Sequence, residues 1–206
     1  MVQQGPLLQI LRRPPVAPQE RCEFCGAGMD ERHGHLVDLA RHAILCVCRP
    51  CYLLFTHDGA GGKRFRAIPQ RYQPVQEFAT AQDAWELLQI PIGLAFFFRS
   101  SITGRMTAFY PSPAGATESE LSLDAWESVV RAAPMLQTMA DDVEAFLVRK
   151  TDARVQGMIV PIDACYELVG RIRMSWRGFQ GGDELWRGVD DFFTQVSQRV
   201  DSEVAS

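Results

Sequence analysis

The chain has 206 residues, of which 47% are apolar and 22% charged, as is typical of a soluble globular protein with room for one ordinary domain and a small one. The longest uninterrupted apolar run, residues 90–98, is far shorter than the roughly 20 residues that a membrane-spanning helix needs. The first residues lack a secretory signal pattern, so we expect a cytoplasmic protein without a membrane span. The net charge is −4.

The charge is divided unevenly along the chain. Residues 1–74 hold ten Lys and Arg against six Asp and Glu, whereas residues 75–206 hold eleven against nineteen. The change of sign indicates two units with different surfaces. The acidic main part argues against nucleic acid as a general partner, because phosphate contacts need a positive surface, and leaves that role only to the basic N-terminal part.

Residues 1–20 contain four prolines and no sustained periodicity, so we expect a flexible arm. Residues 21–58 follow with two C-x2-C pairs, Cys22 with Cys25 and Cys48 with Cys51. Two such pairs about 20 residues apart indicate a metal site, because each turn points two thiolates to one side and two turns supply four soft ligands. In a reducing compartment a metal site is favoured over disulfides.

The segment between the two pairs supports a compact metal-binding finger. Residues 35–39 and 43–48 are short β-type runs that can form a hairpin, and a short helix is expected to start at the second pair. This order of turn, hairpin and helix over residues 22–57 resembles treble-clef zinc fingers. A zinc ribbon, with a strand after Cys51, is the alternative.

Zinc with a structural role is the metal expected at the four cysteines, because closed four-cysteine sites are usually structural. These four cysteines are preferred as the ligand set because both pairs are expected to share one loop geometry. A rubredoxin-like single iron uses the same two loops and is the alternative. An iron–sulfur cluster that recruits Cys46 is a further one, but we expect Cys46 to pack as a small apolar residue. We expect each of the four histidines of the chain either to be solvated or to hydrogen-bond to a metal ligand without binding the metal: His33, His35, His42 and His57.

Residues 59–76 are rich in Gly, Pro and Arg and are predicted to be a linker. Beyond it, residues 77–206 predict an α+β domain. A helix is expected over 80–89, a strand hairpin over 93–100 and 104–111, a loop over 111–120 that can close over a ligand, and a helix from 122 or 124 to 133.

A second strand pair is expected at 144–150 and 156–162, followed by a helix that Asp163 caps and a final helix from Asp183. Short sequential strands predict an antiparallel sheet with helices on one face. Residues 77–206 contain no histidine, and their one thiol, Cys165, lies on the predicted core stripe of a helix. The sequence therefore assigns no catalytic residue and favours a protein that is not an enzyme.

Four stretches from residue 85 onward, "AFYPSPAGATES", "LDAW", "VPIDACYELVGRIRMSWRGF" and "GGDELW", resemble a family of uncharacterised bacterial proteins. Members of that family tend to be encoded beside nickel–iron hydrogenases of the actinobacterial, high-affinity type. The resemblance implies an accessory role for a hydrogenase and carries no catalytic residues.

We therefore predict a metal-binding accessory or assembly protein that acts by protein–protein contact, with a hydrogenase subunit or maturation factor as partner. A rubredoxin-like electron carrier is the alternative. Nucleic-acid binding through the basic finger is a further one. Its phosphate contacts would come from six basic side chains: Arg32, Arg41, Arg49, Lys63, Arg64 and Arg66.

Overall fold

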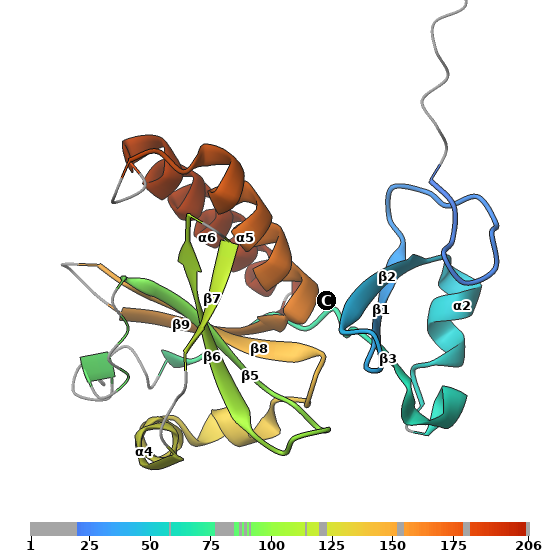
Figure 1. The fold of residues 1–206 in the computed structure, drawn as a ribbon, viewed down its shortest axis with the longest axis horizontal. Coiled ribbons are helices and arrows are strands. Elements are labelled where there is room, and N and C mark those ends of the chain that lie inside the picture. Colours follow the sequence, from blue (N-terminus) through green and yellow to red (C-terminus); the bar gives the residue numbers. More distant parts are fainter. Residues whose placement is uncertain are drawn as a thin grey trace, which may run out of the picture.

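The computed structural model describes residues 20–57, 59–76, 85–86, 88, 90, 92–113, 115–119, 123–151, 155–178 and 182–204. These residues form two antiparallel sheets of different size, each accompanied by helices (Figure 1). The predicted α+β class, with a four-cysteine cluster near the N-terminus, is confirmed. Among the described residues, no helix has both the length and the apolar character needed to cross a membrane.

The smaller sheet has three strands in the order β2–β1–β3. Strands β1 (Gly34–Asp38) and β2 (Ala43–Val47) form the predicted hairpin, and α2 (Arg49–Leu54) follows directly as the predicted short helix. Helix α2 packs closely on β1, since a Cβ atom at Gly34 would lie 2.5 Å from the ring of Tyr52. We call residues 20–57 together with β3 (Phe65–Ala67) the small unit.

The stretch expected to be a linker contains secondary structure. It holds η1 (Ala60–Lys63), strand β3 of the small sheet and strand β4 (Gln73–Pro74) of the large sheet. Strands of three and two residues are too short to produce a visible alternation of apolar and polar residues. Composition alone therefore indicated a loop here.

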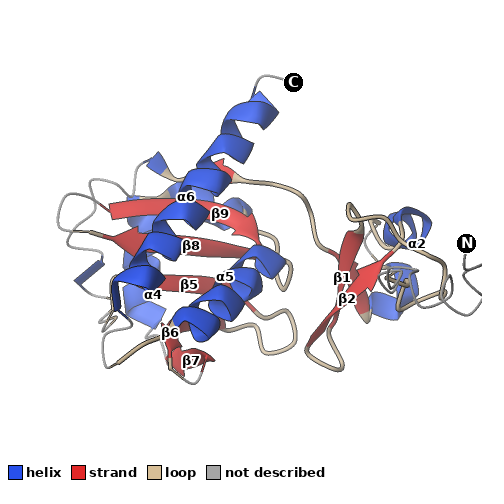
Figure 2. Ribbon diagram, turned by 90° about the horizontal axis from the view of Figure 1, so that it is seen from above, coloured by secondary structure: helices blue, strands red, loops and turns tan. Residues whose placement is uncertain are grey.

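The large sheet has six strands in the order β4–β9–β8–β5–β6–β7, and Figure 2 shows β9 to β7 side by side in this order. The two predicted strand pairs are confirmed. They are β5 (Leu94–Arg99) with β6 (Met106–Ser112) and β8 (Glu144–Lys150) with β9 (Val155–Pro161). Pairing of β5 with β8 joins the two hairpins at the centre of the sheet.

The predicted loop after β6 was wrong in part. Residues 115–119 form strand β7 (Gly115–Ser119), which pairs with β6 from Ala108 to Ser112. Pro111 is tolerated in β6 because it lies beyond Phe109, where the pairing of β6 with β5 ends. The helix expected over 80–89 falls largely outside the described residues.

Helices cover both faces of the large sheet, so the expectation of helices on one face was wrong. Helices α5 (Ile162–Ser175) and α6 (Gly182–Val204) lie on one face, and α4 (Leu123–Ala132) lies on the other (Figure 1). η3 (Pro134–Thr138) follows α4 on that second face. The cause is visible in β5, where Phe96 packs into the α5–α6 cluster and Phe97 into the α4 cluster. A strand with apolar side chains on both faces must be shielded from water on both faces, here by helices.

The small unit contacts the large sheet and α5 through polar pairs. His35 of β1 lies against Asp163 of α5, with Nδ1 and Oδ2 2.5 Å apart. Arg66 of β3 donates to the carbonyl oxygen of Asp141 at 3.1 Å and forms an ion pair with Asp142. These contacts fix the edge of the small unit that carries His35 beside the start of α5.

Candidate metal centre

The sulfur atoms of Cys22, Cys25, Cys48 and Cys51 all lie within 4.8 Å of one another. The Sγ atoms of Cys25 and Cys48 are 3.7 Å apart. Two thiolates bound to one tetrahedral ion at about 2.3 Å would be separated by about 3.8 Å. The spacing of these donors matches a tetrahedral site, and the four cysteines could hold a metal ion.

The first pair lies in a tight turn that points sulfur toward backbone amides. The amide of Gly26 donates to the carbonyl oxygen of Cys22 at 2.8 Å, and the amide of Cys25 donates to the Cys22 sulfur at 3.4 Å. Gly26 has a φ of +75°, in the left-handed region that glycine adopts without strain. The glycine directly after the first pair therefore permits the turn that holds both sulfur atoms on one side.

The second pair has a different geometry, so the expectation of two equal loops was wrong. Cys48 is the residue before α2, and Cys51 lies within the helix. Pro50 occupies the first turn of α2, where its fixed φ suits a helix. Proline has no N–H, and this costs nothing here because N–H groups in the first turn have no carbonyl partner within the helix. One turn of helix places Cys48 and Cys51 on the same side.

Burial is unequal around the four sulfur atoms. Cys22 and Cys51 are buried, whereas Cys25 is exposed. Burial raises the pKa of the Cys22 thiol, but hydrogen bonds from the backbone of Cys48, Cys25 and Phe24 outweigh it and lower the pKa to about 6. Burial also raises the pKa of Cys51, and hydrogen bonds with the neighbouring thiols add to the rise. The Cys22 thiolate therefore forms readily, and a bound cation would favour loss of the proton from Cys51.

Cys46 lies outside this set. It packs against the small unit's apolar core, as predicted, and its sulfur also lies within 4.8 Å of ring nitrogens of His33 and His35. The hydrogen bond that His35 donates to the carboxylate of Asp163 raises the pKa of His35 above its ordinary value. The sequence did not indicate this grouping, although the His-x-His pattern at 33–35 was visible. The remaining two histidines, His42 and His57, are exposed.

Some of the basic side chains considered for phosphate contacts are engaged inside the protein. Arg64 donates twice to the carboxylate of Asp38, at 3.0 and 2.7 Å, and Asp38 is buried. These hydrogen bonds hold the pKa of Asp38 below its ordinary value. Arg66 donates a hydrogen bond to the carbonyl oxygen of Asp141 and forms an ion pair with Asp142. Both guanidinium groups therefore hold the small unit together or fix it to the large sheet.

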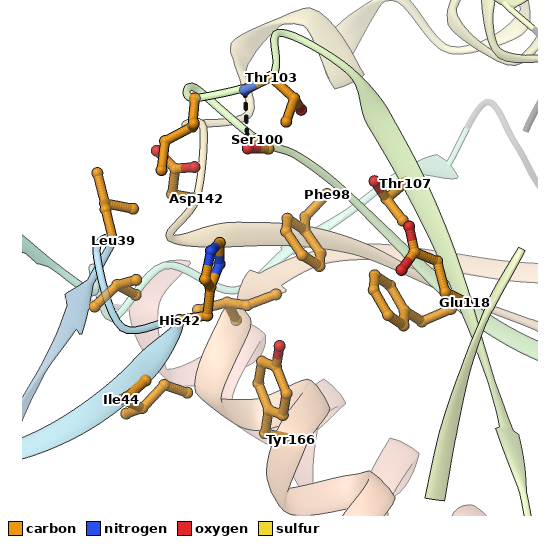
Figure 3. Close-up of a pocket in the computed structure, with 15 residues that line it drawn as sticks. Leu39, His42, Ile44, Phe98, Ser100, Thr103, Thr107, Glu118, Asp142 and Tyr166 are labelled. Carbon is orange, nitrogen blue, oxygen red and sulfur yellow. Dashed lines mark hydrogen bonds between the residues drawn. The ribbon is translucent and has the colours of Figure 1, made fainter. Parts of the chain in front are cut away.

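A cavity of about 500 Å³ lies between the β1–β2 turn and the large sheet (Figure 3). Its walls include Ile44 from β2, Phe98 from β5 and Tyr166 from α5, so they are largely apolar. Asp142 supplies a carboxylate at one end. Its Oδ1 accepts a hydrogen bond from the amide of Ser101 at 2.8 Å. Its Oδ2 forms an ion pair with Arg66 but accepts no hydrogen bond. The stretch expected to close over a ligand contributes Glu118 to this cavity.

The thiol of the large unit, by which we mean the six-stranded sheet with α4, α5 and α6, is a core group. Cys165 is fully buried in the cluster under α5 and α6, beside Leu168 and Ile172. Burial raises its pKa well above the ordinary value. A neutral, enclosed thiol does not act as a nucleophile, so the predicted packing role of Cys165 holds.

The comparisons with known proteins give one match. A family model described as "Family of unknown function (DUF5947)" matches residues 21–200, which span both sheets and all four clustered cysteines. No curated protein and no solved structure matches the chain.

Proposed function

The chain belongs to the DUF5947 family, whose function is unknown, and we propose that it is a metal-binding accessory protein that acts by protein–protein contact. The observation that carries the proposal is the set of four cysteine sulfur atoms within 4.8 Å of one another. In this proposal residues 21–58 are a metal-binding finger that follows an arm of residues 1–20. Residues 59–76 connect the finger to an α+β body of residues 77–206.

Cys22, Cys25, Cys48 and Cys51 bind zinc in this proposal, and the zinc has a structural role. Four thiolates fill a tetrahedral coordination sphere, which leaves no position for a substrate. The second pair begins a helix, as in the treble-clef fingers that the sequence resembles. A rubredoxin-like iron site uses two matching loops, and the unequal geometry of the two pairs supports zinc over iron.

An iron electron carrier is the second candidate, and two observations favour it. Cys25 is exposed, which would give electrons a route to the metal. The amide of Cys25 donates to the Cys22 sulfur, and such bonds tune the potential of iron–thiolate centres. Metal analysis with a visible absorption spectrum of protein produced with both metals available separates the two candidates. One colourless zinc per chain supports the structural role, and coloured protein with iron overturns it.

The partner in this proposal is a hydrogenase subunit or maturation factor, because the sequence resembles proteins encoded beside nickel–iron hydrogenases. Protein contact is supported by α2, where Leu53 and Leu54 are 48% and 64% exposed next to the second cysteine pair. Large apolar side chains exposed together are typical of contact surfaces. The internal pairing of Arg64 and Arg66 gives no support to nucleic acid as the partner.

The partner is tested by co-purification with defined hydrogenase subunits and maturation proteins. The wild-type chain should retain one of them, and a Leu53→Asp, Leu54→Asp double variant should lose it. Met174→Asp is the matched control, because Met174 is 82% exposed on α5, away from α2. If the wild-type chain retains none of these proteins, the hydrogenase assignment is wrong.

A further inference from the structure

Three potential metal ligands gather at one end of the β1–β2 hairpin, apart from the four-cysteine set. His35 and Cys46 are directly opposite each other in the pairing of β1 with β2, and His33 lies two residues before His35. One donor atom from each of these side chains lies within 4.8 Å of the others. The Nε2 atoms of His33 and His35 are 3.2 Å apart. Two imidazole nitrogens on one tetrahedral ion at 2.0–2.1 Å would be separated by about 3.3 Å.

The far side of each imidazole ring is held as it is in known metal sites. Nδ1 of His35 lies 2.5 Å from Oδ2 of Asp163, and Nδ1 of His33 lies 3.2 Å from the carbonyl oxygen of Asp30. A histidine that binds a metal through one nitrogen usually donates the other N–H to a carboxylate or a backbone carbonyl. Both rings meet this condition, and both direct Nε2 to the same point.

The two Nε2 atoms are close enough to share a hydrogen bond. When each Nδ1–H is donated to its own acceptor, that hydrogen bond needs a further proton on one of the two Nε2 atoms. A metal ion bound by both Nε2 lone pairs is the alternative occupant of the same position. The rings are largely shielded from water, with the His33 and His35 side chains 14% and 27% exposed.

The site is open on one side. A cleft of about 770 Å³ between the small unit and the large unit is lined by His33, His35 and Asp163. Three protein ligands with a fourth position left to water or a small ligand are typical of working metal sites, whereas four thiolates close a structural one. Two imidazoles and one thiolate suit borderline divalent ions such as Zn²⁺ and Co²⁺ better than Mg²⁺ or Ca²⁺.

We propose that His33, His35 and Cys46 form a second metal site, which binds one Zn²⁺-class ion and keeps one coordination position open to the cleft. Asp163 is a positioning residue, because it orients His35 without reaching the ion. It lies on α5, 128 residues further along the chain, so the site is complete only when the small unit rests on the large one. The inference is independent of the metal and the partner proposed above.

The test is Co²⁺ titration of the full chain, prepared metal-free under reducing conditions. The wild type should bind two Co²⁺ ions per chain, one of them with the strong sulfur-to-cobalt absorption of four thiolates. A His33→Ala, His35→Ala double variant and a separate Cys46→Ser variant should each bind one Co²⁺ and keep the four-thiolate spectrum. His57→Ala is the matched control and should still bind two, because His57 is exposed and outside the cluster.

The retained four-thiolate spectrum shows that the small unit of each variant is folded. Asp163→Asn should weaken the second Co²⁺ by about 10–100-fold and leave the first unchanged. One Co²⁺ per chain in the wild type would overturn the proposal. So would a second Co²⁺ that both the histidine variant and Cys46→Ser retain, or loss of both ions in each of these two variants.

Discussion

Removal of metal from the four cysteines should unfold the small unit and leave the large unit folded. Apart from its clustered cysteines, the small unit's core contains four buried apolar side chains, those of Met29, Leu36, Val47 and Tyr52. Their burial contributes roughly 6–12 kcal/mol. Strands β1 and β2 and helix α2 hold five, five and six residues. Ordering these sixteen residues costs about 16–32 kcal/mol.

Structural zinc in a small finger contributes about 10–16 kcal/mol. With this contribution, the favourable free energy of burial and metal binding comes to within a few kcal/mol of the cost of ordering the chain. Without the metal the small unit has a deficit of about 10–20 kcal/mol. A loss of even ~4 kcal/mol in opening free energy corresponds to ~1000-fold faster exchange of protected amides. The amides of β1 and β2 should therefore lose essentially all protection when the metal is removed.

The assay is hydrogen exchange with mass spectrometry on the full chain, before and after chelation under reducing conditions. Peptides that cover Gly34–Val47 should become fast-exchanging, whereas peptides from β8 and β9 should keep their protection as an internal control. A Cys51→Ala variant should behave like the chelated protein. Unchanged protection of Gly34–Val47 in a chain shown to contain no metal would refute the reasoning, because the apolar core would then suffice.

Two further predictions concern ion pairs. Arg71→Ala removes two 2.7 Å hydrogen bonds from the buried carboxylate of Glu144 and should lower the unfolding free energy by about 3–5 kcal/mol in chemical denaturation. Arg131→Ala, which breaks an exposed pair, should change it by less than about 1 kcal/mol, and equal effects of the two would contradict the burial argument. Arg64 lowers the pKa of Asp38, so this pair stabilises the fold above the unfolded-state pKa of about 3.9 and loses its effect as the pH falls through the folded-state value. The difference in unfolding free energy between the wild type and Asp38→Asn should therefore become smaller as the pH falls. A difference that does not change with pH would contradict a stabilising role of the Arg64–Asp38 pair.

Local features were predictable from the sequence because a few neighbouring residues determine them. The spacing of Cys22 with Cys25 and of Cys48 with Cys51 indicated a four-sulfur cluster, and short apolar runs separated by turn residues located both main strand pairs. Prediction failed at residues 115–119, which were expected to be a loop and form β7, and at the two-residue strand β4 in the expected linker. Strand β4 forms by pairing with the distant strand β9. Strand β7 pairs with its neighbour β6 across a short turn, in a stretch whose prolines and glycine indicated a loop.

The sequence by itself determined the α+β class, three of the hairpins (β1–β2, β5–β6 and β8–β9), the α4, α5 and α6 segments and the cysteine cluster, since turn residues and apolar patterns act over a few residues. Only the tertiary structure decided that helices cover both faces of the large sheet, because Phe96 and Phe97 each need apolar cover. Only the tertiary structure brought Asp163 to His35, across 128 residues. Docking of the small unit on α5 creates that contact, and the packing of whole surfaces that governs docking is encoded in no local pattern.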